Sequence, residues 1–354
     1  MPRILLLAAL ALWACDGAPA PVDAASPTAD AGPSDAGPSD APLELTLTDP
    51  PAGVDAPARF AEGVAYGPEE AQRLDALLPA DPGGPVGAIL WVHGGGFTQG
   101  SRSDIWEGGA REPSEAVRAG LAWISVGYRL LEDDEREGVL GPMSDARRAL
   151  QFVRHHADAF GIDPARIGLR GSSAGAGTAL WIALSDDMAD PGAADPVERV
   201  STRVTAVAVR STQATYDLLR WGPDVFMPRY DVTTEALFLA SSARRRYVAR
   251  FYGLPASATA DADALRAALE SPEMSAYRAQ VDLLSLFSDD DPPALIVNEG
   301  PDAPPTDAEF DPLHHPLHAL ALQGVGNAET VVGAPALDVE ADVTALDFLL
   351  ARLR

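Results

Sequence analysis

The sequence contains no lysine: all 26 of its basic residues are arginine, set against 52 aspartate and glutamate residues. The absence of lysine excludes a Schiff-base mechanism, a serine–lysine dyad and a phosphate-binding P-loop lysine. The formal net charge of −26 disfavours binding to nucleic acid or to an anionic membrane surface, because either polyanion is repelled on average. We therefore expect no nucleic-acid partner.

Cysteine is almost absent too, with Cys15 the single example, so no disulfide can form within one chain. Cys15 directly follows an apolar run, residues 4–14, that is preceded by Arg3 and is too short to span a bilayer. Residues 12–15, Leu-Trp-Ala-Cys, resemble the lipobox of a bacterial lipoprotein signal, although Trp13 stands where a small residue is usual. The resemblance implies an exported cell-envelope lipoprotein, periplasmic or on the outer surface, whose membrane contact is a lipid on Cys15; the alternative is an ordinary cleaved signal.

After this signal segment, residues 1–15, the composition shifts to alanine, proline, aspartate, serine and glycine. Residues 16–42 have no apolar periodicity and contain a near repeat, ASPTADAGPSDAGPSDAP. Such a segment cannot repay the entropy lost on ordering. We expect a disordered, semi-extended tether that holds the following domain away from a membrane or cell surface.

From residue 43 to residue 354, strand-like and helix-like patterns alternate. Several strand-like segments are apolar on both faces, which is typical of strands buried in a parallel sheet. We therefore expect an α/β fold with a mostly parallel central sheet, helices on both faces and a helical, cap-like insertion. The expected strands are 43–49, 58–67, 86–93, 121–128, 165–171, 204–210, 293–300 and 328–332, and the expected helices cover 144–160 and begin at Ala174.

The patterns contain one set of such elements, so we expect a single domain with an insertion at about 211–291. The insertion is rich in aromatic residues and arginine, and we expect it to cover a pocket as a cap; the alternative is that its helices simply pack on the sheet. Its arginine run, residues 244–246, could meet an anionic substrate, although such a run is usually a solvated helix face.

The segment Gly-Ser-Ser-Ala-Gly at 171–175 fits the pattern G-x-S-x-G. The pattern alone is a weak signal, but here it follows a predicted strand and opens onto a predicted helix, which is the context it requires. Gly171 and Gly175 remove side chains that would clash in a sharp turn, and the helix N-terminus favours negative charge that develops near Ser173. Ser173 is therefore the candidate nucleophile, whereas Ser172 lies one residue out of register and is expected to pack.

A second motif, His-Gly-Gly-Gly-Phe at 93–97, ends another predicted strand. Three consecutive glycines let backbone N–H groups point into a cavity, as an oxyanion hole for a tetrahedral intermediate requires. Alone the segment could be a flexible loop, and His93 within it is expected to be structural. The joint occurrence of both motifs, each at a strand end, favours an enzyme.

With these two motifs, the chain from about Phe60 onward resembles the α/β-hydrolase superfamily and, within it, the HGGG-bearing esterases related to hormone-sensitive lipase and to the feruloyl-esterase-like group. The resemblance implies that Ser173 is the nucleophile and that the amides of Gly95, Gly96 and Ala174 form the oxyanion hole. It says little about substrate. The matching segments are VAYG with LD downstream (64–75), HGGGF, Tyr-Arg-Leu at 128–130, Asp145 in SDARRAL, FGIDPARIGL and GSSAG.

The acid of this family follows the penultimate strand. Counting along the strand at 293–300 places Asp302 there, whereas counting back from the next helix, expected to start near Pro316, places Asp311 there. We prefer Asp302 because the strand offset depends on fewer assumptions, and Asp311 is the alternative. Either could instead be a loop or helix-cap residue.

The family's histidine lies after the last strand, and this chain has no histidine beyond His318. The base must then come from elsewhere, and geometry matters more than chain position. The segment DPLHHPLHAL follows the penultimate strand and lies on the catalytic side of the sheet in this fold. Its His315 is our first choice, with His314 second and His318 third; the other possibility is that these histidines cap a helix and fill the core. His155 and His156 lie on a helix remote from the strand ends.

The same histidines also suggest a metal site as an alternative. His314 and His318 are four residues apart, as two zinc ligands on one helical face would be. However, Pro316 between them indicates that the helix is only beginning there, and the remaining ligands would have to be carboxylates. The carboxylates available are Asp302, Asp307, Glu309 and Asp311. We expect neither a metal nor a cofactor.

Two functions remain. The first is a surface-tethered serine hydrolase acting on a small-molecule ester, with a histidine relocated from the usual position. The second is a non-catalytic binding lipoprotein of the same fold that has lost its base. The missing late histidine favours the second, whereas the intact turn around Ser173, the oxyanion glycines and the histidine cluster favour the first.

Overall fold

The computed structural model describes residues 42–132 and 136–354 of the chain. The signal segment, the lipidation site Cys15 and all but the last residue of the expected tether lie outside these described residues. Within the two described ranges, no helix is long and apolar enough to cross a membrane.

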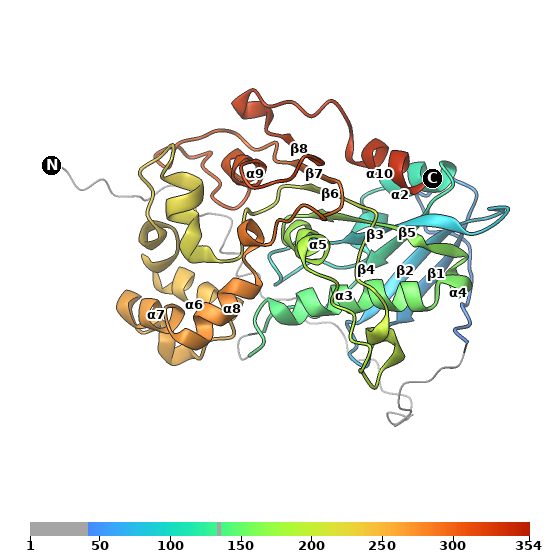
Figure 1. Ribbon diagram of the computed structural model, residues 1–354, viewed down its shortest axis with the longest axis horizontal. Coiled ribbons are helices and arrows are strands. Elements are labelled where there is room, and N and C mark those ends of the chain that lie inside the picture. Colours follow the sequence, from blue (N-terminus) through green and yellow to red (C-terminus); the bar gives the residue numbers. More distant parts are fainter. Residues whose placement is uncertain (1–41, 133–135) are drawn as a thin grey trace, which may run out of the picture.

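A single eight-stranded sheet forms the centre, in the order β1-β2-β4-β3-β5-β6-β7-β8 (Figure 1). The β2 strand pairs antiparallel with both β1 and β4, and all other neighbours are parallel. This confirms the expected mostly parallel sheet. The strands are β1 Ala58–Ala65, β2 Arg73–Pro79, β3 Val86–Val92, β4 Ala122–Val126, β5 Ile162–Ser172, β6 Ala206–Arg210, β7 Ala294–Val297 and β8 Thr330–Gly333.

Helices cover both faces of this sheet, and β3 illustrates why. Its seven residues are all buried, and alternate side chains belong to two different cores: Leu90 packs on one face and Ile89 and Trp91 on the other. The helices are α1 Asp104–Glu107, α2 Arg111–Arg118, α3 Leu140–His155, α4 Ala157–Phe160, α5 Ala174–Leu184, α9 Pro316–Gln323 and α10 Ala345–Leu353, with short 3₁₀ turns η1 Pro196–Arg199 and η7 Pro335–Leu337.

The α2 and α10 helices pack on one face of the sheet, and α3 and α5 pack on the other. Since α5 lies on the face beneath β3 and β5, its N-terminus is held at the carboxyl ends of the central strands. The sheet thus delivers the end of β5, the end of β3 and the loop after β7 to the same edge.

The segment between β6 and β7 folds as a set of short helices, as expected for the insertion. Figure 1 shows α6, α7 and α8 grouped at one end of the sheet, on the left. Two of its turns are π-helical, a form that sequence periodicity does not distinguish from an α-helix. Its elements are η2 Leu218–Arg220, η3 Trp221–Phe226 (π), η4 Glu235–Leu239 (π), α6 Ser242–Phe251, η5 Ala256–Thr259, α7 Ala262–Leu269, α8 Pro272–Gln280 and η6 Leu283–Ser285.

Arginines 244 and 245 of the insertion are committed to this packing. Arg244 donates to the carbonyl of Ala236, and Arg245 donates at 3.0 Å to the carbonyl of Leu239, at the end of the second π-helix. Because helix-end carbonyls lack intrahelical partners, these guanidinium groups supply the missing hydrogen-bond donors to the π-helix. The interpretation of this run as a solvated face holds only for Arg246, which is exposed.

One expected strand is wrong. Residues 43–49 alternate apolar and polar side chains, yet they form only an isolated bridge between Thr48 and Phe60. The segment lies beside β1 at the sheet edge, where the pairing ends after one bridge. The alternation therefore reflects partial burial of this segment beside β1, and the segment is not a ninth strand.

Candidate active site

The turn between β5 and α5 presents Ser173. Ser173 has φ 53° and ψ −122°, a conformation that non-glycine residues rarely adopt. The turn is sharp enough that a Cβ on Gly175 would lie 2.1 Å from the carbonyl oxygen of Val92, and a Cβ on Gly171 would lie 2.3 Å from that of Gly175. Glycine is therefore required on both sides of the serine, as the motif predicts.

The hydroxyl of Ser173 contacts a histidine from the loop between β7 and α9. Its Oγ lies 2.9 Å from Nε2 of His314, and Nδ1 of His314 lies 2.7 Å from Oδ2 of Asp311. A carboxylate beside Nδ1 fixes the proton on that nitrogen, which leaves Nε2 to accept from the serine. Ser173, His314 and Asp311 thus form one hydrogen-bonded chain.

The carboxylate of Asp311 is held in its ionised form. Burial by itself would raise its pKa, but the hydrogen bond from His314 and the backbone amide of Leu313, which donates at 2.9 Å, outweigh burial and hold the pKa below its usual range. An ionised Asp311 orients the imidazole and stabilises the imidazolium that forms when the ring takes a proton.

The first-choice base, His315, is not at Ser173, so that prediction is wrong. Its side chain is fully buried and caps α9: Nδ1 accepts from the amide of Leu317 at 3.2 Å, and Nε2 lies 3.2 Å from the carbonyl oxygen of Ala303. Both ring nitrogens therefore have partners away from the serine. Burial also lowers the pKa of His315, which keeps the ring neutral near pH 7.

The first-choice acid, Asp302, is also wrong as a partner of the histidine beside Ser173. Its carboxylate accepts from the hydroxyl of Tyr230 at 2.7 Å and forms an ion pair with Arg229, both from the insertion. The nearest histidine nitrogen is that of His315, at 3.8 Å. Asp302 therefore fastens the insertion to the loop that carries Asp311 and His314.

The third candidate, His318, is fully buried behind the site. Its Nδ1 accepts from the amide of Ala214 at 3.0 Å and its Nε2 donates to the carbonyl of Pro312 at 2.8 Å, so the ring is neutral. Burial lowers its pKa to about 3. Both ring nitrogens of His318 have protein partners, so this ring is not available to form the zinc pair with His314 that was considered above. No group of three or more His, Cys, Asp or Glu side chains in residues 42–132 and 136–354 could hold a metal ion.

The sequence contains a signal for the pair of Asp311 and His314. Asp311 and His314 are three residues apart in one loop, a spacing that lets an aspartate accept from a following histidine. The residue before a helix-starting proline is the N-cap, and here His315 occupies that position. The capping role removes His315 from the site and leaves His314 as the ring that can turn outward.

The glycine loop after β3 supplies backbone amides near Ser173. Gly95 has φ +105°, and a Cβ there would lie 2.0 Å from the carbonyl oxygen of Gln99, so the loop conformation requires glycine. Among the described residues, none accepts a hydrogen bond from the backbone N–H groups of Gly95, Gly96 or Ala174. Gly96 and Ala174 line the same cavity as Ser173.

A tyrosine holds this loop in place. The hydroxyl of Tyr128 donates to the carbonyl of His93 at 2.8 Å, and its ring stacks on the imidazole of His93 with centroids 4.0 Å apart. Next to it, the amide of Leu131 donates to the carbonyl of Phe97 at 2.7 Å. His93 is therefore structural, as expected, and the Tyr-Arg-Leu segment supports the glycine loop.

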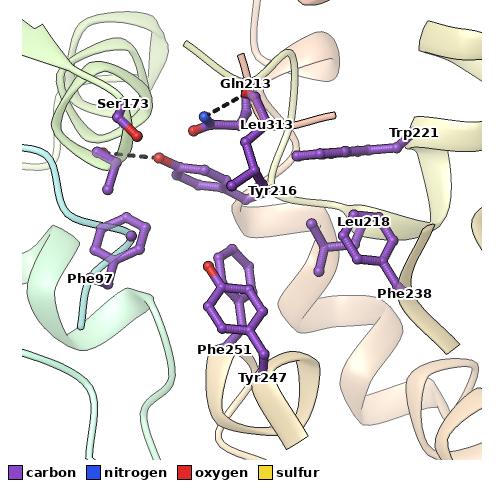
Figure 2. A pocket seen from close by; sticks show the side chains of 12 residues that line it. Phe97, Ser173, Gln213, Tyr216, Leu218, Trp221, Phe238, Tyr247, Phe251 and Leu313 are labelled. Carbon is purple, nitrogen blue, oxygen red and sulfur yellow. Dashed lines mark hydrogen bonds between the residues drawn. The ribbon is translucent and has the colours of Figure 1, made fainter. Parts of the chain in front are cut away.

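The cavity beside Ser173 has a volume of about 30 Å³. Figure 2 shows its largely aromatic wall, which combines residues of the central fold with residues of the insertion. The insertion thus covers the cavity as a cap. The lining residues are Gly96, Phe97, Ser173, Ala174, Gln213, Tyr216, Leu218, Trp221, Phe238, Tyr247, Phe251 and Leu313.

Solved structures share this arrangement of sheet and helices. A truncated carbohydrate esterase from gut microbiota superposes with a TM-score of 0.54 at 18% identity, covering 83% of this chain and 89% of that one. Esterase B from Lactobacillus rhamnosis superposes with a TM-score of 0.52 at 16% identity, covering 83% and 81%. The chain has the α/β-hydrolase fold.

One protein-family model matches a continuous part of this chain. The model of the BD-FAE family matches residues 74–240, which include the glycine loop and Ser173 but neither Asp311 nor His314. Acetylcholinesterase of Gallus gallus is 40% identical over 112 residues, and carboxylesterase patB of Penicillium expansum is 31% identical over 160 residues. The matches cover 30% and 40% of this chain and only 14% and 28% of those relatives.

Proposed function

We propose that this α/β-hydrolase is a serine hydrolase that cleaves carboxylic esters through an acyl-enzyme. The observation that carries the proposal is the continuous hydrogen-bonded chain from Ser173 through His314 to Asp311, set beside backbone amides that have no acceptor among the described residues. Nucleophile, base and orienting acid within hydrogen-bond reach are the arrangement that acyl transfer requires.

In the first half of the reaction, Ser173 Oγ attacks the ester carbonyl carbon while its proton passes to His314 Nε2. The carbonyl oxygen becomes negatively charged and is held by the N–H groups of Gly95, Gly96 and Ala174. When the tetrahedral intermediate collapses, the bond to the alcohol oxygen breaks, and the alcohol leaves with the proton from His314. Asp311 stays ionised and balances the charge on the imidazolium.

In the second half, water takes the place of the alcohol. His314 accepts a proton from the water, whose oxygen attacks the acyl carbon, and the bond to Ser173 Oγ then breaks as His314 returns the proton to the serine. The carboxylic acid is released and the enzyme is restored. An ester is favoured over a peptide because the similar proteins named above are esterases.

The alternative of a non-catalytic binding protein rested on the absence of a histidine after the last strand. His314 lies 2.9 Å from Ser173 Oγ, which supports a base that reaches the nucleophile from a different loop and so supports the enzyme over the binding protein.

A direct test compares p-nitrophenyl acetate hydrolysis by residues 43–354 with that of Ser173→Ala. We expect kcat/KM to fall at least about a hundredfold, because the nucleophile is lost. Ser172→Ala is the matched control and should retain activity, since Ser172 lies at the end of β5 outside the cavity lining. The proposal fails if Ser173→Ala keeps wild-type activity, or if a fluorophosphonate probe does not label Ser173.

We also propose that a lipid on Cys15 tethers the enzyme to the cell envelope. The short apolar run, the lipobox-like residues 12–15 and the tether-like composition of 16–42 support this. The full chain expressed in a bacterium should incorporate labelled palmitate and sediment with membranes, and Cys15→Ala should do neither. Incorporation that persists in Cys15→Ala would contradict the proposal.

A further inference from the structure

The cavity next to Ser173 contains one side-chain amide, that of Gln213, in a wall that is otherwise mainly aromatic and aliphatic. Gln213 follows β6 and is 5% exposed. Its Nε2 donates to the carbonyl of Leu313 at 2.9 Å. A carbonyl oxygen can only accept, so this bond identifies which end of the amide is the nitrogen and fixes the orientation of the group.

With Nε2 occupied, the Oε1 of Gln213 is the end that faces the site. Figure 2 shows the amide between Leu313 and Ser173, with its oxygen on the side of Ser173. Within residues 42–132 and 136–354, no group donates a hydrogen bond to this oxygen. An amide oxygen in the cavity wall that has no donor within the protein is free to accept a hydrogen bond from a bound molecule in place of water.

The backbone around Gln213 is held on both sides. The amide of Thr212 donates to Oδ1 of Asn298 at 2.9 Å, and the amide of Ala214 donates to Nδ1 of the buried His318 at 3.0 Å. The acceptor is therefore set in place before a substrate arrives, as a specificity-determining group should be.

The position of the cavity indicates which part of an ester it holds. Its lining includes Ser173 and the oxyanion residues Gly96 and Ala174, whereas His314 is not among the residues that line it. The leaving alcohol must lie near His314 Nε2 to receive its proton, and the His314 side chain is 31% exposed, so the alcohol can extend into solvent. The cavity on the oxyanion side then receives the acyl group.

The size of the cavity limits that acyl group. A volume of about 30 Å³ is small beside the roughly 300–1,000 Å³ of a typical small-molecule site, so only a short acyl group fits. The bulky side chains of Tyr216, Trp221 and Phe238 close it. A two-carbon acyl group that carries one further small substituent fits this space.

We propose that Gln213 selects esters of short hydroxyacids, because its Oε1 accepts a hydrogen bond from a hydroxyl on the carbon next to the ester carbonyl. The inference rests on the proposed serine esterase function. The neighbouring Tyr216 hydroxyl already donates to the carbonyl of Ala174 at 2.9 Å, so it does not supply this recognition as a donor.

The test uses two esters of equal size, methyl glycolate and methyl propionate, in which a hydroxyl replaces a methyl group. Proton release gives kcat/KM for each. In the wild type, we expect the glycolate-to-propionate ratio to exceed the ratio of their alkaline hydrolysis rates by roughly tenfold, the effect of one hydrogen bond in an enclosed site. This comparison needs no variant, so it decides the proposal even if every Gln213 variant fails to fold.

Two variants of Gln213 separate recognition from positioning. Gln213→Leu loses both ends of the amide, and we expect the roughly tenfold excess for glycolate to disappear. Gln213→Glu loses the donor to Leu313 but keeps acceptor oxygens, and we expect the excess to persist although both rates fall. If Gln213 merely positions the loop that carries His314, Gln213→Leu lowers both rates by the same factor and leaves the ratio unchanged, which overturns the inference.

Failure of this inference is distinguishable from failure of the proposed function. Turnover of both esters without any excess for glycolate overturns the role of Gln213 and leaves the esterase intact. Labelling of Ser173 by a fluorophosphonate without turnover of either ester overturns the short-acyl assignment but not the reactive serine. No labelling and no turnover would overturn both.

Discussion

Two adjacent histidines take opposite roles at the scale of single residues. His314 is 31% exposed at its side chain and lies against Ser173, whereas His315 is buried and caps a helix. The two residues are chemically identical, and the neighbouring Pro316 distinguishes them. Pro316 fixes where α9 begins, and therefore which histidine becomes the N-cap. Residue type and spacing reduced the possible histidine partners of Ser173 to three. The direction in which each ring points depends on backbone geometry that the sequence does not show.

His318 leads to a prediction about pH. Its ring is neutral in the folded state, where burial lowers its pKa to about 3, whereas an unfolded histidine has an ordinary pKa near 6.5. Between these values the unfolded chain binds one more proton, so the free energy of unfolding falls by about 1.4 kcal/mol per unit as the pH is lowered.

His318→Gln should remove this dependence. Between pH 6.5 and 4.5, urea unfolding should show that the wild type loses about 2 kcal/mol more stability than the variant. Carboxylates titrate in the same range in both proteins, so the difference between the two proteins isolates the histidine. Equal losses in both would mean that His318 is protonated in the folded state.

At the scale of elements, the insertion and the loop between β7 and α9 are fastened to each other. Tyr230 and Arg229 follow the first π-helix of the insertion, and both bind the carboxylate of Asp302, which lies in the loop that carries Asp311 and His314. The carboxylate of Asp302 therefore joins the insertion to the loop that carries His314, and movement of either element affects the other.

Asp302→Ala tests whether Asp302 is structural. The hydroxyl of Tyr230 loses its acceptor, so we expect the free energy of unfolding to fall by about 1–2 kcal/mol. We expect kcat/KM on p-nitrophenyl acetate to fall less than about tenfold, because Asp311 and not Asp302 orients His314. A loss of a thousandfold with unchanged stability would instead make Asp302 the catalytic acid. Urea unfolding and steady-state kinetics on one preparation give both quantities.

The elements themselves were predictable to different degrees. Long apolar segments such as β3 and β4 were located correctly because burial on both faces leaves a continuous apolar run. Residues 43–49 were mistaken for a strand, since alternation alone cannot tell whether a partner strand is present. The π-helical turns of the insertion, at 221–226 and 235–239, have no sequence signature that distinguishes them from α-helix.

At the scale of the whole molecule, the site combines a part of the chain that matches a known family model with a part that lies outside the match. The glycine loop and Ser173 lie within residues 74–240, which match the BD-FAE family model. Asp311 and His314 lie outside that match, in a loop after the penultimate strand. The parallel sheet makes this possible, because the carboxyl ends of β3, β5 and β7 open onto one edge, where a base can arrive from more than one loop.

The most direct test of this account compares His314→Asn with His315→Asn in residues 43–354. Asparagine is a good N-cap, so the second variant should preserve the start of α9. We predict that His314→Asn lowers kcat/KM for p-nitrophenyl acetate by at least about a hundredfold, whereas His315→Asn stays within about tenfold of the wild type. The role of His314 as the base would be contradicted by the reverse order of activities, or by a His314→Asn variant that is folded and fully active.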